Sequence, residues 1–339
     1  MPKTTFDPKL HGFHFSNSDI KWTIGLQEAP LAEGKALCGG MAYAALDYFI
    51  ARSTIPPVVN APVEGTPLHK YIYDRQTAAH INTIPKFVGS FMPIIGPLVS
   101  HGALNPENEY NRLVQILGRG TPVPLCTVAS GKGHHVLAFA CSPTRPMNIS
   151  IYDPNVPNRT GTITQVASNR YSSTLSPSTV WHGFFVDDAY MFNRPTVVHF
   201  QNNWRWCRKC QCLVFGGSTT GVCAAGGAHN LTGSPNYVID HQVGTGQGGW
   251  RWCFKCEALY YGGHPGSAGI CPDGGIHNGS RSGHYFLQLG KGEGESDWRY
   301  CRICEGLYHA GSGRGVCAAD PKGHDATGSG NYFLSFYRD

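Results

Sequence analysis

The stretch Trp204-Arg205-Trp206-Cys207-Arg208-Lys209-Cys210 occurs three times in this sequence in closely similar forms. It returns as Trp250-Arg251-Trp252-Cys253-Phe254-Lys255-Cys256 and as Trp298-Arg299-Tyr300-Cys301-Arg302-Ile303-Cys304, at intervals of 46 and 48 residues. Repetition at a fixed interval indicates that one small structural unit is used several times. The sequence therefore predicts three related units, at about residues 200–244, 245–292 and 293–339.

Each unit also carries a third cysteine and a histidine at a regular distance. The third cysteine follows the Cys-x2-Cys pair after 12 to 14 residues, and the histidine follows after 5 or 6 more. Three thiolates and one imidazole complete the tetrahedral shell of Zn²⁺ and leave no open position for a substrate. We therefore predict three structural zinc ions. Their ligands are Cys207, Cys210, Cys223 and His229, then Cys253, Cys256, Cys271 and His277, and then Cys301, Cys304, Cys317 and His324.

Other interpretations of the repeat remain open. Disulfides between units are the alternative use of these cysteines, but three per unit is an odd number, and the Cys3His set uses every one. Cys212 lies outside the pattern and occurs only in the first unit. Short strands between glycine-rich turns fit zinc-ribbon-like modules packed in a threefold arrangement, with a β-trefoil as the alternative. In either case residues 200–339 form an all-β, glycine-rich module.

The aromatic residues of the repeats suggest a binding role. We predict that Trp206, Trp252 and Tyr300, at equivalent positions, form a binding face for a glycan or cell-surface ligand, because flat aromatic faces stack on rings. Protein binding and purely structural support are alternatives. The Trp-x-x-Cys-x-x-Cys start resembles the RNA-binding zinc fingers of the Ran-binding type. However, residues 201–339 hold 12 basic and 10 acidic residues, so a nucleic-acid partner is not expected.

The whole chain is long enough for two domains. It has 339 residues, of which 41% are hydrophobic and only 14% charged, with a net charge of +5. The first ten residues lack the apolar segment of a signal peptide. The longest apolar stretch, residues 87–104, is interrupted by glycine, proline and histidine, so no membrane span is expected. These features favour a cytoplasmic protein by default, with non-classical export or injection into a target cell as alternatives.

Residues 1–199 contain no repeat, and three short segments stand out. A helix is predicted to begin at Cys38 and continue through Ile50, since apolar residues recur there with helical spacing. Strands are predicted over residues 133–141 and 148–152. Cys126 and Cys141, in short apolar runs, are predicted core residues. Tyr71-Ile72-Tyr73 followed by Arg75-Gln76 indicates the end of an amphipathic helix that could line a cleft.

These segments contain the residues of a candidate nucleophilic site. Cys38 at a helix start is favoured as thiolate, because the helix dipole and free N–H groups stabilise negative charge. A hairpin with His134 on one strand and Asp153 at the end of the next can place imidazole and carboxylate side by side. Nucleophile, base and orienting carboxylate would then be Cys38, His134 and Asp153. His135, expected on the opposite face of the strand, is the reserve base.

The segments Leu37-Cys38-Gly39-Gly40-Met41, His134-His135-Val136-Leu137-Ala138 and Tyr152-Asp153-Pro154-Asn155 resemble papain-like cysteine peptidases, and most of all the leader peptidases of bacteriocin exporters. The resemblance implies an α+β papain-like domain over residues 1–199. It also implies an oxyanion-hole glutamine before the cysteine. Gln27 is the candidate, although it lies eleven residues before Cys38. Asn17 or a hole made of backbone groups alone are the alternatives.

The sequence thus predicts a thiol hydrolase that transfers acyl groups from a protein or peptide substrate, targeted by a zinc-repeat binding module. Such a pairing suits a secreted toxin or effector. The alternative is a non-catalytic protein that binds a carbohydrate, cell surface or protein and keeps an inactive papain-like domain. A Cys38→Ala exchange separates the two, because only the enzyme loses its effect.

Overall fold

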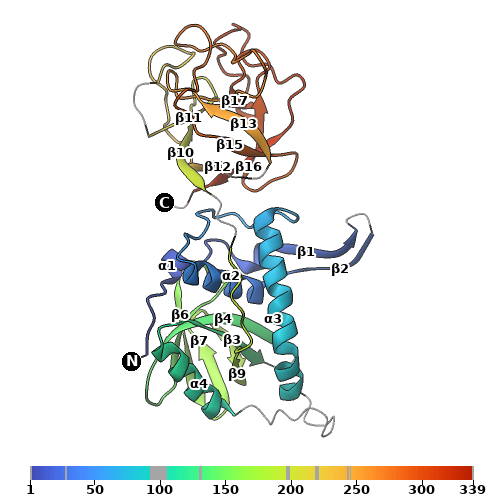
Figure 1. The fold of residues 1–339 in the computed structure, drawn as a ribbon, viewed down its shortest axis with the longest axis vertical. Helices are drawn as coiled ribbons and strands as arrows, with labels where there is room; N and C mark the ends of the chain where they lie inside the picture. The colour runs from blue at the N-terminus through green and yellow to red at the C-terminus, as the bar shows by residue number, and fades with distance from the viewer. Residues whose placement is uncertain are drawn as a thin grey trace. The chain divides into compact units, whose positions relative to one another are not determined.

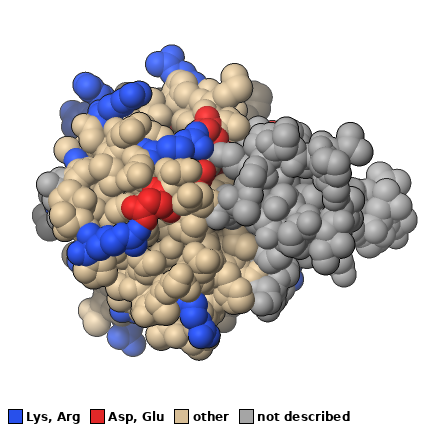
Figure 2. Space-filling model, turned by 90° about the horizontal axis from the view of Figure 1, so that it is seen from below, with Lys and Arg blue, Asp and Glu red and all other residues tan. Residues whose placement is uncertain are grey.

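The computed structural model describes residues 2–26, 29–91, 105–129, 132–195, 199–217, 221–242, 244 and 246–337. The chain is mostly β with few helices (Figure 1). It divides into two compact units, one formed by Met1–Ile55 and Glu64–Thr196, the other by Pro56–Val63 and Val197–Asp339. No helix in the described ranges is long and apolar enough to cross a bilayer. On the face shown in Figure 2, acidic and basic side chains of the described residues are interspersed.

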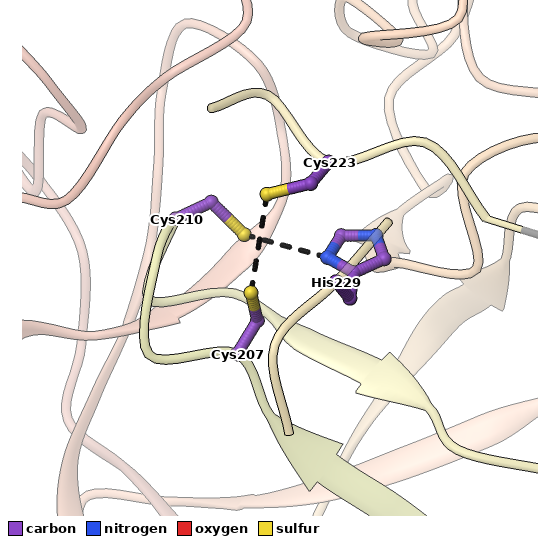
Figure 3. A group of neighbouring side chains, drawn as sticks. All are labelled: Cys207, Cys210, Cys223 and His229. Carbon is purple, nitrogen blue, oxygen red and sulfur yellow. Dashed lines mark hydrogen bonds between the residues drawn. The ribbon is translucent and has the colours of Figure 1, made fainter. Parts of the chain in front are cut away.

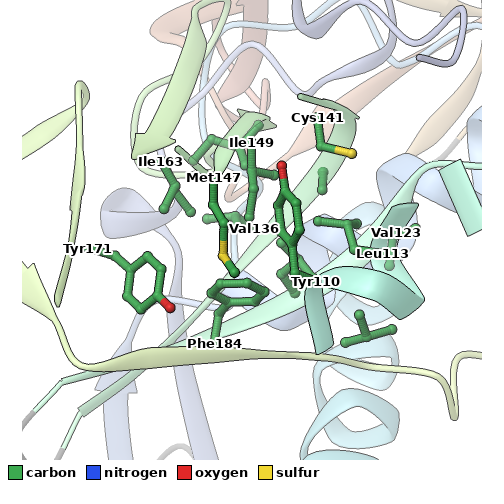
Figure 4. Packing of buried hydrophobic residues seen from close by; sticks show 14 of the residues in the cluster. Tyr110, Leu113, Val123, Val136, Cys141, Met147, Ile149, Ile163, Tyr171 and Phe184 are labelled. Carbon is green, nitrogen blue, oxygen red and sulfur yellow. The ribbon is translucent and has the colours of Figure 1, made fainter. Parts of the chain in front are cut away.

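The first unit is built on a seven-stranded antiparallel sheet in the order β8-β7-β6-β5-β4-β3-β9. The sheet curls into half a barrel. Its strands are β3 (Val123–Ala129), β4 (Lys132–Cys141), β5 (Asn148–Tyr152), β6 (Thr160–Ala167), β7 (Arg170–Ser173), β8 (Ser176–Trp181) and β9 (Gly183–Val186). Helix α4 (Pro106–Gly118) covers one side. Its Tyr110 and Leu113 pack on strand residues such as Val136 and Ile149 (Figure 4).

The remaining elements of this unit precede the sheet in the chain. They are α1 (Pro8–His11), the 3-10 helix η1 (Asn17–Asp19), the hairpin β1 (Lys21–Leu26) with β2 (Ala29–Lys35), α2 (Cys38–Ile50) and α3 (Pro67–Phe91). Helix α2 packs against α3 and β4. The glycine after Gly39 is required for this packing, because a Cβ on Gly40 would lie 2.1 Å from the carbonyl oxygen of Ile72 in α3.

Several expectations about these elements can now be checked. The predicted helix at Cys38 and the two predicted strands are confirmed as α2, β4 and β5. Cys126 and Cys141 are buried, as predicted. The prediction that a helix ends near Arg75-Gln76 is wrong, because α3 continues to Phe91. Both side chains are buried in the middle of this helix, so they mark its packed face and not its end.

The second unit repeats one strand pattern three times. A hairpin is followed by a closing strand that pairs with the first strand of the hairpin. The hairpins are β10 (Phe200–Trp206) with β11 (Leu213–Phe215), β13 (Gln247–Trp252) with β14 (Leu259–Tyr261), and β16 (Glu295–Tyr300) with β17 (Leu307–His309). The closing strands are β12 (Tyr237–His241), β15 (Tyr285–Leu289) and β18 (Tyr332–Phe336).

The three repeats close on one another in a threefold arrangement. Each closing strand pairs with both of the others. The hairpins are also joined in a ring by the bridges Val214–Ala258, Tyr260–Gly306 and Cys212–Tyr308. One shared core lies inside, and Trp204, Trp250 and Trp298 are fully buried in it. The units are therefore parts of a single sheet assembly, because each one supplies the pairing partners and core of its neighbours.

A short segment from the first half of the sequence also belongs to the second unit. Residues 56–63 lie along its last strand, where Val58 bridges to Tyr337 and Asn60 Oδ1 accepts the N–H of Phe336 at 3.4 Å. The N–H of Val63 donates to Glu293 Oε1 at 2.9 Å. This segment, with three prolines in eight residues, is assigned to the second unit although it lies within residues 1–199.

Candidate functional site

Cys38 occupies the first position of α2. The N–H groups of Cys38 and Gly39 fall in the first helical turn, where the helix itself offers no acceptor. The next amide, that of Gly40, donates to Gln76 Oε1 of α3 at 2.7 Å. Cys38 is partly exposed, whereas the other twelve cysteines are buried. A thiol at this position is therefore accessible and close to the positive end of a helix.

His134 and Asp153 meet because β4 and β5 are antiparallel neighbours. The imidazole Nε2 of His134 lies 2.8 Å from Asp153 Oδ1. The carboxylate is 3% exposed and also accepts the N–H of Asn155 at 2.9 Å. The His134 ring is nearly parallel to that of Trp181, with centroids 6.1 Å apart. With Nε2 committed to the carboxylate, Nδ1 is the nitrogen left for Cys38.

The electrostatics of this group favour a thiolate paired with an imidazolium. Desolvation of the sulfur raises the pKa of Cys38, but hydrogen bonding and charge from His134 and His135 outweigh it. The pKa of this thiol therefore lies well below its ordinary value. Desolvation lowers the pKa of His134, but its hydrogen bonds with Asp153 and Cys38 outweigh that effect and raise the pKa to about 10. The lowered pKa of Cys38 and the raised pKa of His134 are the changes that an activated cysteine requires.

His135 departs from expectation. It was predicted to point away from Cys38 on the opposite face of the strand, yet both histidines interact with the Cys38 thiol. The His135 side chain is nearly fully buried, with Nδ1 3.3 Å from where a Cβ on Gly39 would stand. Its Nε2 has no hydrogen-bond partner among the described residues.

The proposed oxyanion residues fall in different places. Gln27 lies outside the described residues. Asn17 is buried, and its Oδ1 accepts the N–H of Leu37 while its Nδ2 donates to Asn155 Oδ1 at 2.9 Å. Both ends of this amide are thus engaged, and Asn17 positions the turn before Cys38. Gln76 was predicted at the end of a helix that could line a cleft; it lies instead in the middle of α3 and accepts the N–H of Gly40 in α2.

The three Cys3His sets converge as three compact clusters. Within each cluster the four ligand atoms all lie within 4.8 Å of one another. In the first cluster, Cys207 Sγ and Cys223 Sγ are 3.9 Å apart, and Cys210 Sγ is 3.7 Å from His229 Nδ1 (Figure 3). The second cluster has an S···S distance of 4.0 Å and an S···N distance of 3.4 Å. All three groups are arranged to hold a metal ion.

These separations fit tetrahedral coordination. Two sulfurs bound to one ion of the size of Zn²⁺ stand about 3.8 Å apart, and a sulfur and an imidazole nitrogen about 3.6 Å apart. Backbone N–H groups also point at the sulfurs at equivalent places. Asn230, Asn278 and Asp325 lie 3.4, 3.3 and 3.4 Å from Cys207, Cys253 and Cys301. Such N–H···S contacts stabilise thiolates and not neutral thiols.

The second nitrogen of each ligand histidine links one cluster to the next. His229 Nε2 lies 2.9 Å from the carbonyl oxygen of Cys256, and His277 Nε2 lies 3.1 Å from that of Cys304. His324 Nε2 closes the ring at 3.0 Å from the carbonyl oxygen of Cys210. Each bond places the proton on Nε2 and leaves Nδ1 free for a metal, as ligand histidines require. Cys212 Sγ lies 3.4 Å from His324 Nε2, beside this ring.

The residues predicted as a binding face make hydrogen bonds through their polar atoms, Trp206 and Trp252 within their own repeats and Tyr300 to the second repeat. The indole N–H of Trp206 donates to Gln211 Oε1 at 2.8 Å, and that of Trp252 donates to Glu257 Oε2 at 2.7 Å. The Tyr300 hydroxyl lies 3.3 Å from His264 Nδ1. All three rings are half-buried against the shared core. The polar atoms of Trp206 and Trp252 therefore stabilise the turn that follows the Cys-x2-Cys pair of their repeat.

Comparisons with protein-family models, curated proteins and solved structures found no match to this chain. The resemblance to papain-like peptidases accordingly rests on the Cys38, His134 and Asp153 segments alone. The chemistry of the two sites has to be argued from their own residues.

Proposed function

We propose that the first unit is a papain-like thiol hydrolase that cleaves amide or ester bonds in a protein or peptide. The observation that carries the proposal is the grouping of Cys38, His134 and Asp153. It includes the 2.8 Å bond that orients the imidazole. Nucleophile, base and orienting carboxylate are the three groups that acyl transfer needs. They come from three separate elements that share no local sequence relation.

In the proposed reaction the Cys38 thiolate attacks the carbonyl carbon, and the carbonyl electron pair moves to oxygen. The tetrahedral intermediate collapses as His134 gives its proton to the leaving amine or alkoxide, which leaves a thioester on Cys38. Water then attacks the thioester with His134 as base. Asp153 keeps the imidazole oriented and stabilises its charged form. Release of the carboxylic acid restores the thiolate and imidazolium.

The test uses p-nitrophenyl acetate, whose acylation of a thiolate releases coloured nitrophenolate. The wild-type chain should show a burst of one equivalent, with acetyl on Cys38 by mass spectrometry. Cys38→Ala should lose the burst, and the matched variant Cys126→Ala should keep it. A burst that survives Cys38→Ala, or acetyl found on other cysteines only, contradicts the proposal.

For the second unit we propose three structural Zn²⁺ ions. Zinc accepts three thiolates and one imidazole in tetrahedral geometry, and a closed shell supplies folding free energy without catalysis. The short hairpins of each repeat, rich in glycine, gain stability from such an ion. Metal analysis of the purified chain should give three zinc ions. His277→Ala should lower the count, whereas the matched variant His264→Ala, outside the three clusters, should not. A count of zero or one in the wild type contradicts this assignment.

A further inference from the structure

We propose that His135 supplies a side-chain hydrogen bond to the oxyanion in the reaction of Cys38. The inference rests on the proposed hydrolase function and adds a residue to it. Papain-like chemistry needs a donor beside the helix N-terminus for the negative oxygen of the tetrahedral intermediate. In this chain a second buried imidazole stands beside the nucleophile, next to the one that forms the pair with Asp153.

The position of His135 fits this role. It follows His134 on β4 and helps to lower the pKa of the Cys38 thiol. Its Nδ1 approaches Gly39, the residue after the nucleophile, to 3.3 Å from a Cβ placed there. The amides of Cys38 and Gly39 are in the first turn of α2. The oxyanion of a substrate bonded to Cys38, if held by these two amides, would therefore lie on the Nδ1 side of the His135 ring.

Other side chains near the thiol are committed elsewhere. Asn17 uses both ends of its amide on Leu37 and Asn155. Gln76 accepts the N–H of Gly40, and its Nε2 lies 2.6 Å from His80 Nε2. His134 is held by Asp153. His135 Nδ1 instead faces Gly39, and its Nε2 has no hydrogen-bond partner among the described residues.

The burial of His135 also selects its proton position. Its Nε2 is buried and has no partner among the described residues. A buried N–H without an acceptor is costlier than a buried acceptor without a donor, so we assign the proton to Nδ1. That N–H is the donor which the oxyanion needs, and it is not consumed in the reaction.

The experiment compares two reactions of Cys38 in the full-length chain. Acylation by p-nitrophenyl acetate passes through an oxyanion, whereas alkylation by iodoacetamide displaces iodide and develops none. Each rate is taken at the plateau of its pH profile, so that a change in thiolate fraction cancels. His135→Leu removes the donor at similar size. His135→Asn keeps an amide N–H near the place of Nδ1.

We expect His135→Leu to lower the acylation rate about 10²- to 10³-fold and to leave the alkylation plateau nearly unchanged. His135→Asn should recover a large part of the acylation rate. An equal loss in both reactions would mean that His135 maintains the structure around Cys38 and does not act on the oxyanion, and it would overturn the proposal, as would no loss in either. A wild type in which Cys38 shows no acylation burst would instead reject the hydrolase function itself.

Discussion

The two candidate sites are built in opposite ways. Each metal cluster takes its four ligands from one repeat, as in the segment from Cys207 to His229. The candidate catalytic group joins Cys38 to His134 and Asp153 across more than half of the first unit. A ligand set that is local in sequence can be recognised from spacing, because all four ligands recur together in one short segment of each repeat. A dispersed group exists only when the sheet and α2 are assembled.

The largest effect should come from removing the metal, which tests whether the clusters stabilise the second unit alone. A strong chelator should unfold the second unit, because structural zinc in small domains contributes about 10–16 kcal/mol of apparent binding free energy. Limited proteolysis should then cut within residues 200–337 and also within 56–63, which pack on β18.

The first unit provides the internal control for this experiment. Residues 132–195 should stay protected, and Cys38 should keep its selective alkylation, since none of the ligands lies in that unit. Equal loss of protection in both units would show that metal removal destabilises the first unit as well as the second.

A smaller loss is expected when the dispersed site loses one contact. Asp153→Asn should lower acylation of Cys38 by about 10²- to 10⁴-fold, because the imidazole loses the carboxylate that orients and charges it. The pKa of His134 should fall from about 10, since the Asp153 hydrogen bond helps to raise it. The measurement is the pH profile of the acylation burst. Its upper limb, where the burst rate falls at high pH, should move to lower pH. An unchanged upper limb would remove Asp153 from the proposed group.

The pH dependence of alkylation should separate Cys38 from the core cysteines. The pKa of Cys38 is held below its ordinary value, whereas burial raises that of Cys126. At pH 6 iodoacetamide should therefore modify Cys38 about 10²-fold faster or more, since only thiolate reacts. Peptide mapping after timed quenching gives both rates. Similar rates at pH 6 would contradict an activated Cys38.

The His134 shift also predicts a stability trend. A histidine whose folded pKa is raised stabilises the fold fully below its unfolded pKa of about 6.5. That contribution is lost as pH rises through about 10. The difference in melting temperature between the wild type and His134→Ala should therefore shrink between pH 7 and 10.

The smallest expected effects compare the repeats with one another. Trp252 gives its indole N–H to buried Glu257. In the third repeat the tryptophan is replaced by Tyr300, and Glu305 Oε2 is buried without a partner among the described residues. Trp252→Phe should destabilise by about 1–2 kcal/mol, and Tyr300→Trp should stabilise by up to about 1 kcal/mol. Denaturant melts of zinc-loaded protein measure both. Loss of stability in Tyr300→Trp would show that the ring shape at this position matters more than the donor.

Much of the local structure could be predicted from the sequence. The start of α2 follows from apolar spacing after Cys38, and β4 and β5 from short apolar runs bounded by turns. The end of α3 could not be predicted, because buried Arg75 and Gln76 look like a polar helix end until their partners are known. The binding face stays a prediction. Half-buried Trp206 and Trp252 are amphipathic, and their polar atoms bond within their own repeat.

The sequence by itself determined the three metal-ligand sets, since the same Cys3His pattern recurs three times at nearly constant spacing. It also determined which cysteine begins a helix. Only the tertiary structure decided that the repeats close into one ring, through bonds such as that from His324 Nε2 to the carbonyl of Cys210. It alone placed His135 beside Cys38 as well. These contacts join residues far apart in the chain, and no local pattern encodes them. They arise when burial of apolar faces brings distant backbone segments together and leaves their polar groups to find partners.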